Sequence, residues 1–328
     1  MPVHLTRLGT LARVIVEGRH RARFLHAMTT AEVGKLVPGD ATFALVATAN
    51  GRHVGQLRLE VEAQALQLVC DAGALAPIVD TLKKHKVADD VRFGAPVEGE
   101  ATLALVLDAA VEGETWPTWL ADRLGPLPAP GRFEARDGLR VTAWDAARSE
   151  LGRPTLHVRG PASDVDALAA ALTDASALPL DVAAYEAARI ASGWPRDGVD
   201  LGPDDLALAS ERLLATVSWT KGCFLGQEVF VMARDRGEVP KRLVGLHLEP
   251  GSDGAAACPA PGAALTTDDG KGAGVLGSSA GADALAVLKR RAAVPGQVVR
   301  LPDGRACAVV PLPLPRHAHG LRAVAETA

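Results

Sequence analysis

A close alternation of β-type and helical segments in residues 1–110 sets the fold class. Apolar β-type runs at 41–48 and 54–61 flank Asn50-Gly51. Because both residues of this pair tolerate positive φ, the segment predicts a tight hairpin. Strands joined by hairpins and interleaved with helices favour an α+β fold over a parallel, doubly wound sheet. The elements predicted here are strands at 11–17, 41–48, 54–61, 66–70, 87–93 and 102–107 and helices at 19–28 and 74–85.

The chain beyond residue 110 predicts two more domains. Residues 112–131 are proline-rich and are expected to form an irregular connection. A second α+β unit follows, with strands at 139–143 and 155–158 and helices at 161–172 and 182–192. Around and beyond a Gly-, Ala- and Pro-rich boundary at 249–262, short strands separated by turns are typical of a small antiparallel barrel. The expected domains are 1–110, 111–240 and 241–328.

Composition limits the classes of partner and compartment. Lys and Arg total 35 against 39 Asp and Glu, a net charge of −4, so the chain lacks the basic excess typical of direct nucleic-acid binding. No apolar run approaches the roughly 20 residues that span a bilayer, and the N-terminus lacks a signal-peptide core. The closest cysteines, Cys223 and Cys258, are 35 positions apart, which excludes zinc-ligand spacing. We expect a cytoplasmic monomer with reduced thiols, no metal site and no membrane partner.

Two short motifs near the C-terminus are misleading. Residues 272–277 satisfy GxGxxG, but a dinucleotide site needs a following helix and an acidic residue about 20 positions on, where Gln297 stands. Residues 277–281 satisfy GxSxG, but a hydrolase elbow needs a strand-turn-helix in a large parallel sheet. Both stretches are interpreted as glycine-rich β structure.

The segment Thr220-Lys221-Gly222-Cys223-Phe224-Leu225-Gly226-Gln227-Glu228 carries more information. Its two glycines permit close backbone approach and unusual dihedral angles. A basic neighbour such as Lys221 lowers the pKa of a thiol and favours the reactive thiolate. The alternative is a tight turn in which Cys223 is only a small, buried apolar residue. The spacing by itself leaves both interpretations open.

This segment resembles the signature of the YgfZ family of folate-binding proteins, whose fold is similar to that of the aminomethyltransferase (T-protein) of the glycine cleavage system. Eukaryotic mitochondrial relatives assist iron–sulfur cluster assembly. The resemblance covers nearly the whole chain. Further matching motifs are Arg23-Phe24-Leu25-His26 with Thr29-Thr30, Arg189-Ile190 with Gly193, Pro195, Gly198 and Asp200, Arg236-Gly237 with Lys241-Arg242-Leu243, and Gly274 with Leu276-Gly277-Ser278. It implies a T-protein-like fold of two mixed α/β subdomains plus a small C-terminal antiparallel β-barrel.

The sequence also departs from these patterns. The two aspartates of the T-protein motif align with Gly55 and Gln56, so the carboxylate that assists methylene transfer is missing. An aminomethyltransferase role is therefore disfavoured. Relative to the YgfZ pattern, Met232 stands where arginine is common and Asp200 replaces a frequent glutamate.

The family resemblance implies a tetrahydrofolate site (for the cofactor or a derivative) in a central cavity where the domains meet. A carboxylate can accept both hydrogens of the pterin edge, for which Asp200 and then Glu228 are the candidates. The aminobenzoyl ring needs an apolar or aromatic surface, for which the candidates are Trp194, Phe224 and Trp219. The anionic glutamate tail needs a cation, for which the candidates are Lys221, Arg189 and Arg236. The predicted cofactor-binding set is Lys221, Gly222, Phe224, Gly226, Gln227, Glu228, Arg189, Trp194 and Asp200, with Cys223 as the functional thiol.

Two functions follow from the resemblance. The first is a folate-binding protein that supports assembly or repair of iron–sulfur enzymes, including tRNA-modifying ones, through transient contacts and a redox-capable Cys223. One cysteine cannot hold a cluster alone, because clusters usually take four thiolates. The alternative is a folate-dependent one-carbon transferase or demethylase, with His53 or Asp200 as the candidate acid or base. A third possibility is a binding protein whose cavity is vestigial.

Overall fold

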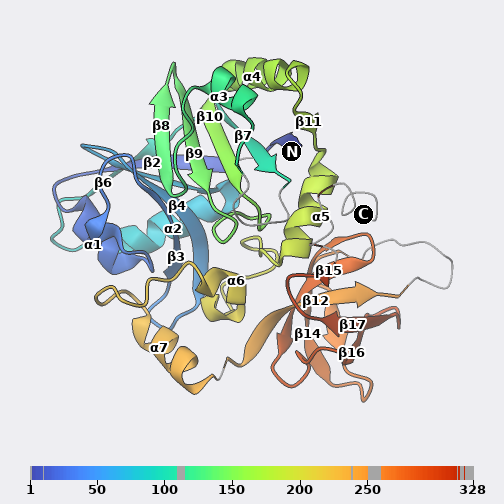
Figure 1. The fold of residues 1–328 in the computed structure, drawn as a ribbon. Helices are drawn as coiled ribbons and strands as arrows, with labels where there is room; N and C mark the ends of the chain where they lie inside the picture. Colours follow the sequence, from blue (N-terminus) through green and yellow to red (C-terminus); the bar gives the residue numbers. More distant parts are fainter. Residues whose placement is uncertain are drawn as a thin grey trace. The chain divides into compact units, whose positions relative to one another are not determined.

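The expected mixture of strands and helices is present in a computed structural model, which describes residues 2–9, 11–108, 115–237, 239–249, 260–315, 317 and 321 (Figure 1). By its internal contacts the chain divides into two compact units. Unit 1 comprises Met1–Val46, Val54–Val182 and Thr216–Leu225, and unit 2 comprises Ala47–His53, Ala183–Ala215 and Gly226–Ala328. The three domains expected from the sequence divide the chain in another way, and their boundaries stay a prediction.

The first sheet of unit 1 has five strands in the order β3-β4-β5-β2-β6. Alternating apolar residues give it one buried face, as in the pairs Leu59–Leu68 and Val14–Leu68. Phe24 and Ile78, from the two helices, pack into the same core. The elements are β2 (Leu11–Glu17), α1 (Arg21–Met28), the 3₁₀ turn η1 (Val33–Lys35), β3 (Ala41–Ala47), β4 (His53–Val61), β5 (Leu66–Asp71), α2 (Ala72–His85) and β6 (Arg92–Pro96).

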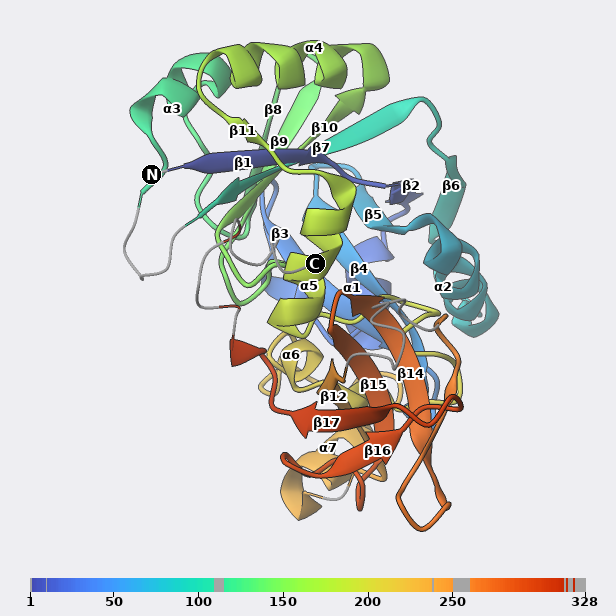
Figure 2. The ribbon, with the colours of Figure 1, turned by 90° about the vertical axis from the view of Figure 1, so that its right-hand side faces the viewer.

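The second sheet of unit 1 has six strands in the order β11-β1-β7-β10-β9-β8. Helices α3 and α4 lie along one of its faces (Figure 2). Leu120 of α3 and Val165 and Leu172 of α4 join the apolar core of the central strands. The elements are β1 (Val3–Arg7), β7 (Glu100–Leu107), α3 (Thr118–Leu124), β8 (Arg132–Arg136), β9 (Leu139–Trp144), β10 (Thr155–Pro161), α4 (Ala162–Asp174) and β11 (Leu178–Pro179).

A buried ionic cluster links the two sheets of unit 1. Glu60 of β4 is 2% exposed and accepts hydrogen bonds from Arg159 (2.6 Å), Thr142 (2.8 Å) and Arg140 (3.2 Å). Burial alone would raise the pKa of Glu60, but the two guanidinium groups and these hydrogen bonds outweigh it and lower the pKa. The carboxylate therefore stays ionised between the sheets and pairs them through charge-assisted bonds.

Unit 2 contains the expected barrel, drawn in orange to red in Figure 1. Its strands close in the order β12-β15-β14-β13-β16-β17 around a core that includes Leu246, Leu276 and Leu288. The barrel strands are β12 (Lys241–Leu248), β13 (Ala264–Thr266), β14 (Gly272–Ala280), β15 (Asp283–Lys289), β16 (Val298–Arg300) and β17 (Ala306–Val310). The elements that precede it are α5 (Val182–Ser192), η2 (Ala207–Ala209), α6 (Glu211–Leu214) and α7 (Gln227–Arg236).

Most predicted elements are confirmed, and the two misleading motifs do lie in strand β14 and the turn that follows it. The strand predicted at 87–93 is wrong for most of its length, because β6 covers only Arg92–Pro96. Val87, which suggested that strand, is 92% exposed. The connection at 112–131 was expected to be irregular, but it contains α3, which begins after Pro117, where proline's fixed φ suits a helix start. Strands β1, β8, β11 and β13 were not predicted.

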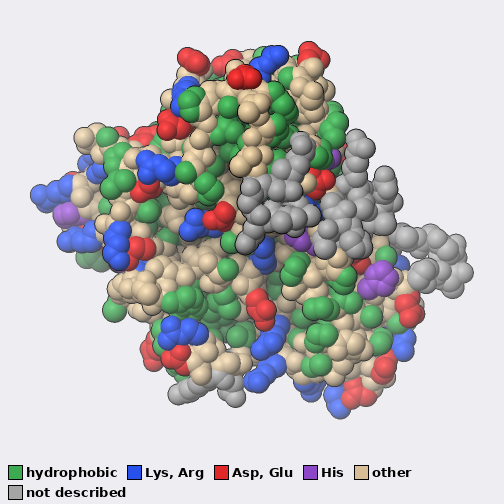
Figure 3. All heavy atoms as spheres, in the orientation of Figure 1, with side chains coloured by type: hydrophobic (Ala, Val, Ile, Leu, Met, Phe, Trp, Pro, Cys, Tyr) green, Lys and Arg blue, Asp and Glu red, His purple; other side chains and the backbone are tan. Residues whose placement is uncertain are grey.

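Charged groups of both signs are interspersed on the face shown in Figure 3. This mixture agrees with the near-balanced composition. None of the helices in the described ranges combines the length and the apolar character that a bilayer crossing requires. The cytoplasmic location stays a prediction.

Candidate functional site

The predicted site residues belong to both units of the chain. Unit 1 contains Lys221, Gly222, Cys223 and Phe224, and unit 2 contains Arg189, Trp194, Asp200, Gly226, Gln227 and Glu228. Each group is coherent within its own unit. The side chain of Arg236, a candidate for the glutamate tail, lies outside the described residues.

Lys221 is a buried anchor at the end of helix α1. Its ammonium donates hydrogen bonds to the backbone carbonyls of Thr29 (2.6 Å), Ala31 (2.9 Å) and His26. These carbonyls belong to the last turn of α1 and the segment after it, where a cation is favoured by the helix dipole. The ammonium also lies 5.1 Å from the centroid of the Phe224 ring. Lys221 therefore holds the cysteine segment against α1.

Burial of Lys221 has an electrostatic consequence. Desolvation lowers the pKa of Lys221 to about 8, and the carboxylate of Glu32 acts in the opposite direction. The neighbouring His26 also has a lowered pKa, through its own burial and the positive charge of Lys221. Burial and the neighbouring Lys221 thus both favour the neutral form of His26, whose Nδ1 accepts from the backbone N–H of Gly34 and lies 3.1 Å from Oε1 of Glu32.

Cys223 is exposed, whereas Cys70 and Cys307 are buried. Backbone hydrogen bonds pin the chain on both sides of it, from Ser218 to Thr30 (3.0 Å) and from Leu225 to Ala27 (2.9 Å). This placement excludes the interpretation of Cys223 as a buried apolar residue. The thiol is therefore exposed on an irregular segment that is anchored on both sides.

The two glycines of the motif differ in what they do. At Gly226 the backbone has φ of +80°, and an added Cβ would lie 2.5 Å from the carbonyl oxygen of Thr48. Only glycine fits this position, which begins α7 and places Gln227 and the exposed Glu228 in its first turn. At Gly222 an added Cβ would meet no atom nearer than 3.9 Å. Steric contacts therefore explain why position 226 needs glycine, and no steric contact explains the glycine at position 222.

Asp200 is the centre of a closed network in unit 2. Its Oδ1 accepts from the backbone N–H of Ser278 (2.6 Å), and its Oδ2 accepts from the Ser278 hydroxyl (3.0 Å), the Arg196 N–H (2.8 Å) and Arg189 (3.0 Å). The approach is so close that a Cβ at Gly277 would lie 2.2 Å from Oδ1. This contact explains a glycine that the sequence placed in a hydrolase-like motif. Asp200 ties α5 and the loop after it to strand β14.

Arg189 is likewise used within unit 2. Its guanidinium donates to Glu186 through Nε and Nη2 (3.0 Å each), to Asp200, and to the Trp194 carbonyl. Burial alone would lower the pKa of Arg189, but the carboxylates of Asp200 and Glu186 more than offset it and raise the pKa. With these donors and acceptors occupied, Arg189 and Asp200 have structural roles here. Their predicted contacts with folate stay predictions.

His53 forms an acid–imidazole pair that the motifs did not predict. Its Nε2 lies 2.7 Å from Oδ1 of Asp197, across 144 positions of sequence. His53 is 3% exposed, and within the described part of the chain its Nδ1 has no hydrogen-bond partner. The sequence singles out His53 as a candidate acid or base in the stretch where the T-protein pattern has its aspartates, but it gives no signal for Asp197 as its partner.

Trp194 is buried, and the guanidinium of Arg212 lies 5.5 Å from the centroid of its ring. Trp219 is half-buried in unit 1. Among the described residues, no three His, Cys, Asp or Glu side chains are grouped so that they could hold a metal ion.

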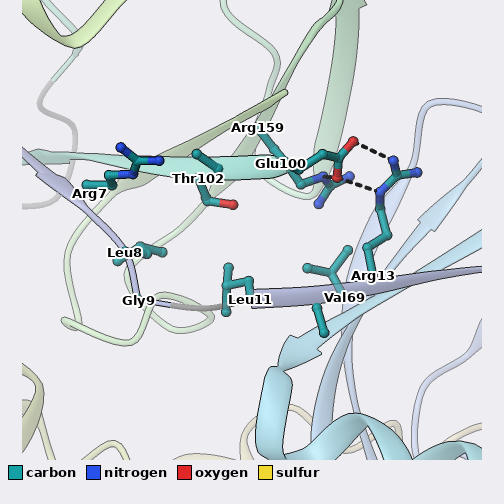
Figure 4. Close-up of a pocket in the computed structure, with 11 residues that line it drawn as sticks. Arg7, Leu8, Gly9, Leu11, Arg13, Val69, Glu100, Thr102 and Arg159 are labelled. Carbon is teal, nitrogen blue, oxygen red and sulfur yellow. Dashed lines mark hydrogen bonds and ion pairs between the residues drawn. The ribbon is translucent and has the colours of Figure 1, made fainter. Parts of the chain in front are cut away.

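A cavity of about 250 Å³ in unit 1 is bordered by β1, the segment after it and β7 (Figure 4). Its arginines are each paired with a carboxylate. Arg13 binds Glu100 (2.8 Å), Arg159 binds Glu60 (2.6 Å), and Arg7 binds Asp166 (2.5 Å). The cavity therefore has no spare positive charge for an anionic ligand.

The Asp200 network generates a stability prediction. Asp200→Asn removes the charge that faces buried Arg189, and breaking such a buried pair should lower the free energy of unfolding by about 3 kcal/mol. Urea denaturation measures this loss. Asp204→Asn, at an exposed side chain four positions away, is the control and should change the value by less than about 0.5 kcal/mol. Equal effects of the two substitutions would contradict the assignment.

The lowered pKa of Lys221 predicts a pH effect of defined sign. The unfolded chain keeps its lysine proton up to about pH 10.4, whereas the folded protein loses that of Lys221 at about pH 8. The unfolded state therefore binds more protons between these values, and the free energy of unfolding should rise with pH, by at most about 1.4 kcal/mol per unit. Lys221→Met should lose this slope, and Lys35→Met, at an exposed lysine, should keep it. Identical slopes in all three proteins would refute the prediction.

The barrel and the longer chain are both similar in sequence to known proteins. Residues 241–312 match the family model described as the CAF17 C-terminal β-barrel domain. An aminomethyltransferase of Mycobacterium avium is 27% identical over 257 residues, which are 75% of this chain and 66% of that protein. A mitochondrial iron–sulfur cluster assembly factor IBA57 homologue of Phaeosphaeria nodorum is 23% identical over 259 residues, 76% of this chain and 56% of that protein. This chain thus spans less than two thirds of the length of either relative.

The fold itself matches a solved structure. The glycine cleavage system aminomethyltransferase T of Bartonella henselae superposes with a TM-score of 0.77 at 21% identity, covering 95% of this chain and 86% of that one. The predicted α+β fold with a C-terminal barrel is therefore confirmed as the T-protein fold. Together, the matched barrel, the IBA57 homologue and the shared fold confirm the predicted resemblance of this chain to the YgfZ/CAF17/IBA57 family.

Proposed function

We propose that this protein binds tetrahydrofolate or a derivative and supports the assembly or repair of iron–sulfur enzymes, including tRNA-modifying ones, with Cys223 as its functional thiol. The observation that carries the proposal is the exposed Cys223 on a segment held by backbone hydrogen bonds to Ala27 of α1 and to Thr30 just after it. The names of two relatives also support the proposal: one is an iron–sulfur cluster assembly factor homologue and the other is an aminomethyltransferase.

The chemistry open to Cys223 depends on the exposure of its thiol and on the number of exposed cysteines nearby. An accessible thiolate can form a mixed disulfide with a client thiol or contact a cluster for a short time. Cys223 is the one exposed cysteine among those that the structure describes, so a cluster at this place needs most of its usual four ligands from the client. The partners are accordingly iron–sulfur enzymes or their assembly proteins, met transiently, with no direct nucleic-acid or membrane contact.

The folate part of the proposal rests on the T-protein fold of the chain and on the absence of the aspartates of the T-protein motif. The T-protein motif has aspartates where this chain has Gly55 and Gln56. Without those carboxylates, a bound folate lacks the group that would assist methylene transfer, so binding without that transfer is the simpler function. Folate would then act as a ligand that stabilises the folded protein, because any ligand that binds only the native state does so.

One observation favours the alternative of a folate-dependent one-carbon transferase or demethylase. The His53–Asp197 pair is a buried imidazole held by a carboxylate, with Nδ1 unpartnered among the described residues. Such an arrangement can accept a proton. Methylene transfer from a methylamine donor, lost in His53→Gln, would favour this alternative.

The folate half is tested by calorimetric titration of tetrahydrofolate into the protein under anaerobic conditions. We expect saturable binding with a dissociation constant at or below about 100 μM, equivalent to roughly −5.5 kcal/mol. Anaerobic work protects both ligand and thiol. Absence of heat, and of any competition at millimolar folate, would refute folate binding and leave Cys223 as a redox or interaction site.

The iron–sulfur half is tested in cells under oxidative stress. A Cys223→Ala strain should lose activity of iron–sulfur enzymes and of iron–sulfur-dependent tRNA modification, whereas a Thr220→Ala strain should not. Thr220 is an exposed neighbour in the same segment, which makes it a matched control. Full activity in the Cys223→Ala strain, at equal protein abundance, would count against the role of the thiol.

A further inference from the structure

A groove of about 360 Å³ in unit 2 differs in charge from the cavity of Figure 4. It lies beside α6, between the segment Ser210–Ala215 and the strands and loops of the barrel. Residues that line it include Arg212, Ala215, Arg242, Leu243, Pro311 and Leu312. None of the predicted folate or thiol residues is among its lining residues.

Arg242 gives the groove its unbalanced charge. This residue of β12 is half-buried, and within the described ranges of the chain its guanidinium has no hydrogen bond or ion pair. Arg212 adds a second guanidinium on the same groove, held over Trp194. The one acidic lining residue is Glu211, which is exposed. Arg242 thus gives the groove a guanidinium that no described residue pairs, whereas each arginine labelled in Figure 4 is paired with a carboxylate.

The walls of the groove are apolar and stiff. Pro295, Pro311 and Pro313 contribute rings with a fixed φ, and Leu243 and Leu312 also line the groove. A wall of this kind needs little reordering when a ligand enters, which lowers the entropic cost of binding. Its volume falls at the lower end of small-molecule sites.

We infer that this groove binds a small monocarboxylate with an aryl or branched alkyl body, its carboxylate paired with Arg242 and its body against the proline and leucine walls. A planar guanidinium matches a carboxylate through two parallel hydrogen bonds. The apolar body suits walls that offer few polar partners. Glu211 disfavours a dianion such as phosphate, because it adds a like charge to the rim of the site.

The experiment uses 3-phenylpropionate as the probe with the full-length protein. Titration followed by calorimetry or by NMR of the probe should give saturable binding below about 1 mM. Arg242→Gln should weaken it at least tenfold. Arg291→Gln is the matched control, since Arg291 is an exposed barrel arginine outside this groove, and it should leave binding within twofold. The neutral amide of the probe should not bind.

A second variant tests the place of binding without removing a charge. Ala215 is exposed at the end of α6 with ordinary helical dihedral angles, so Ala215→Phe should fold and should block the groove, again with at least a tenfold loss. Thermal melting confirms that each variant is folded. The inference is overturned by no binding at millimolar probe, by equal binding of the amide, by unchanged binding in Arg242→Gln, or by inorganic phosphate binding in place of the probe.

Discussion

Unit 2 depends on one buried carboxylate. Asp200 accepts four hydrogen bonds and faces the fully engaged guanidinium of Arg189, so both charges are removed from water only because each has its partner. The network joins the end of α5, the loop after it and strand β14. It also dictates the residue at Gly277, where any side chain would strike the carboxylate. A local motif resembling a hydrolase elbow is thereby explained by a contact from 77 positions earlier in the chain.

The cysteine segment shows how neighbours in one motif acquire different tasks. Lys221 is buried, and its ammonium donates hydrogen bonds to three backbone carbonyls near the end of α1. Cys223, two residues on, is exposed. Gly226 is required by a positive φ and a close backbone contact. Within a few residues the segment therefore combines a buried lysine that anchors the backbone with an exposed thiol.

The cavity of Figure 4 and the groove beside α6 differ in whether their arginines are paired with carboxylates. The guanidinium groups of Arg7, Arg13 and Arg159, which line the cavity of Figure 4, each pair with a carboxylate: Asp166, Glu100 and Glu60 respectively. The groove beside α6 has an arginine that no described residue neutralises, set among prolines and leucines. A half-buried cation with apolar surroundings gains most from an anion that brings its own apolar body.

Local patterns in the sequence determined the fold class, the hairpin at Asn50-Gly51, most helices and strands, and the barrel, because periodicity and turn chemistry act within a few residues. They failed at Val87, an apolar residue that lies on the surface, and at α3, which a proline-rich stretch concealed. The family motif identified the resemblance that comparison confirmed. Only the tertiary structure decided that Asp200 is enclosed, that Cys223 is exposed, that His53 meets Asp197 and that Arg242 is unpaired within the described chain. The physical reason is that donors and acceptors find partners across distances of chain that no local pattern encodes.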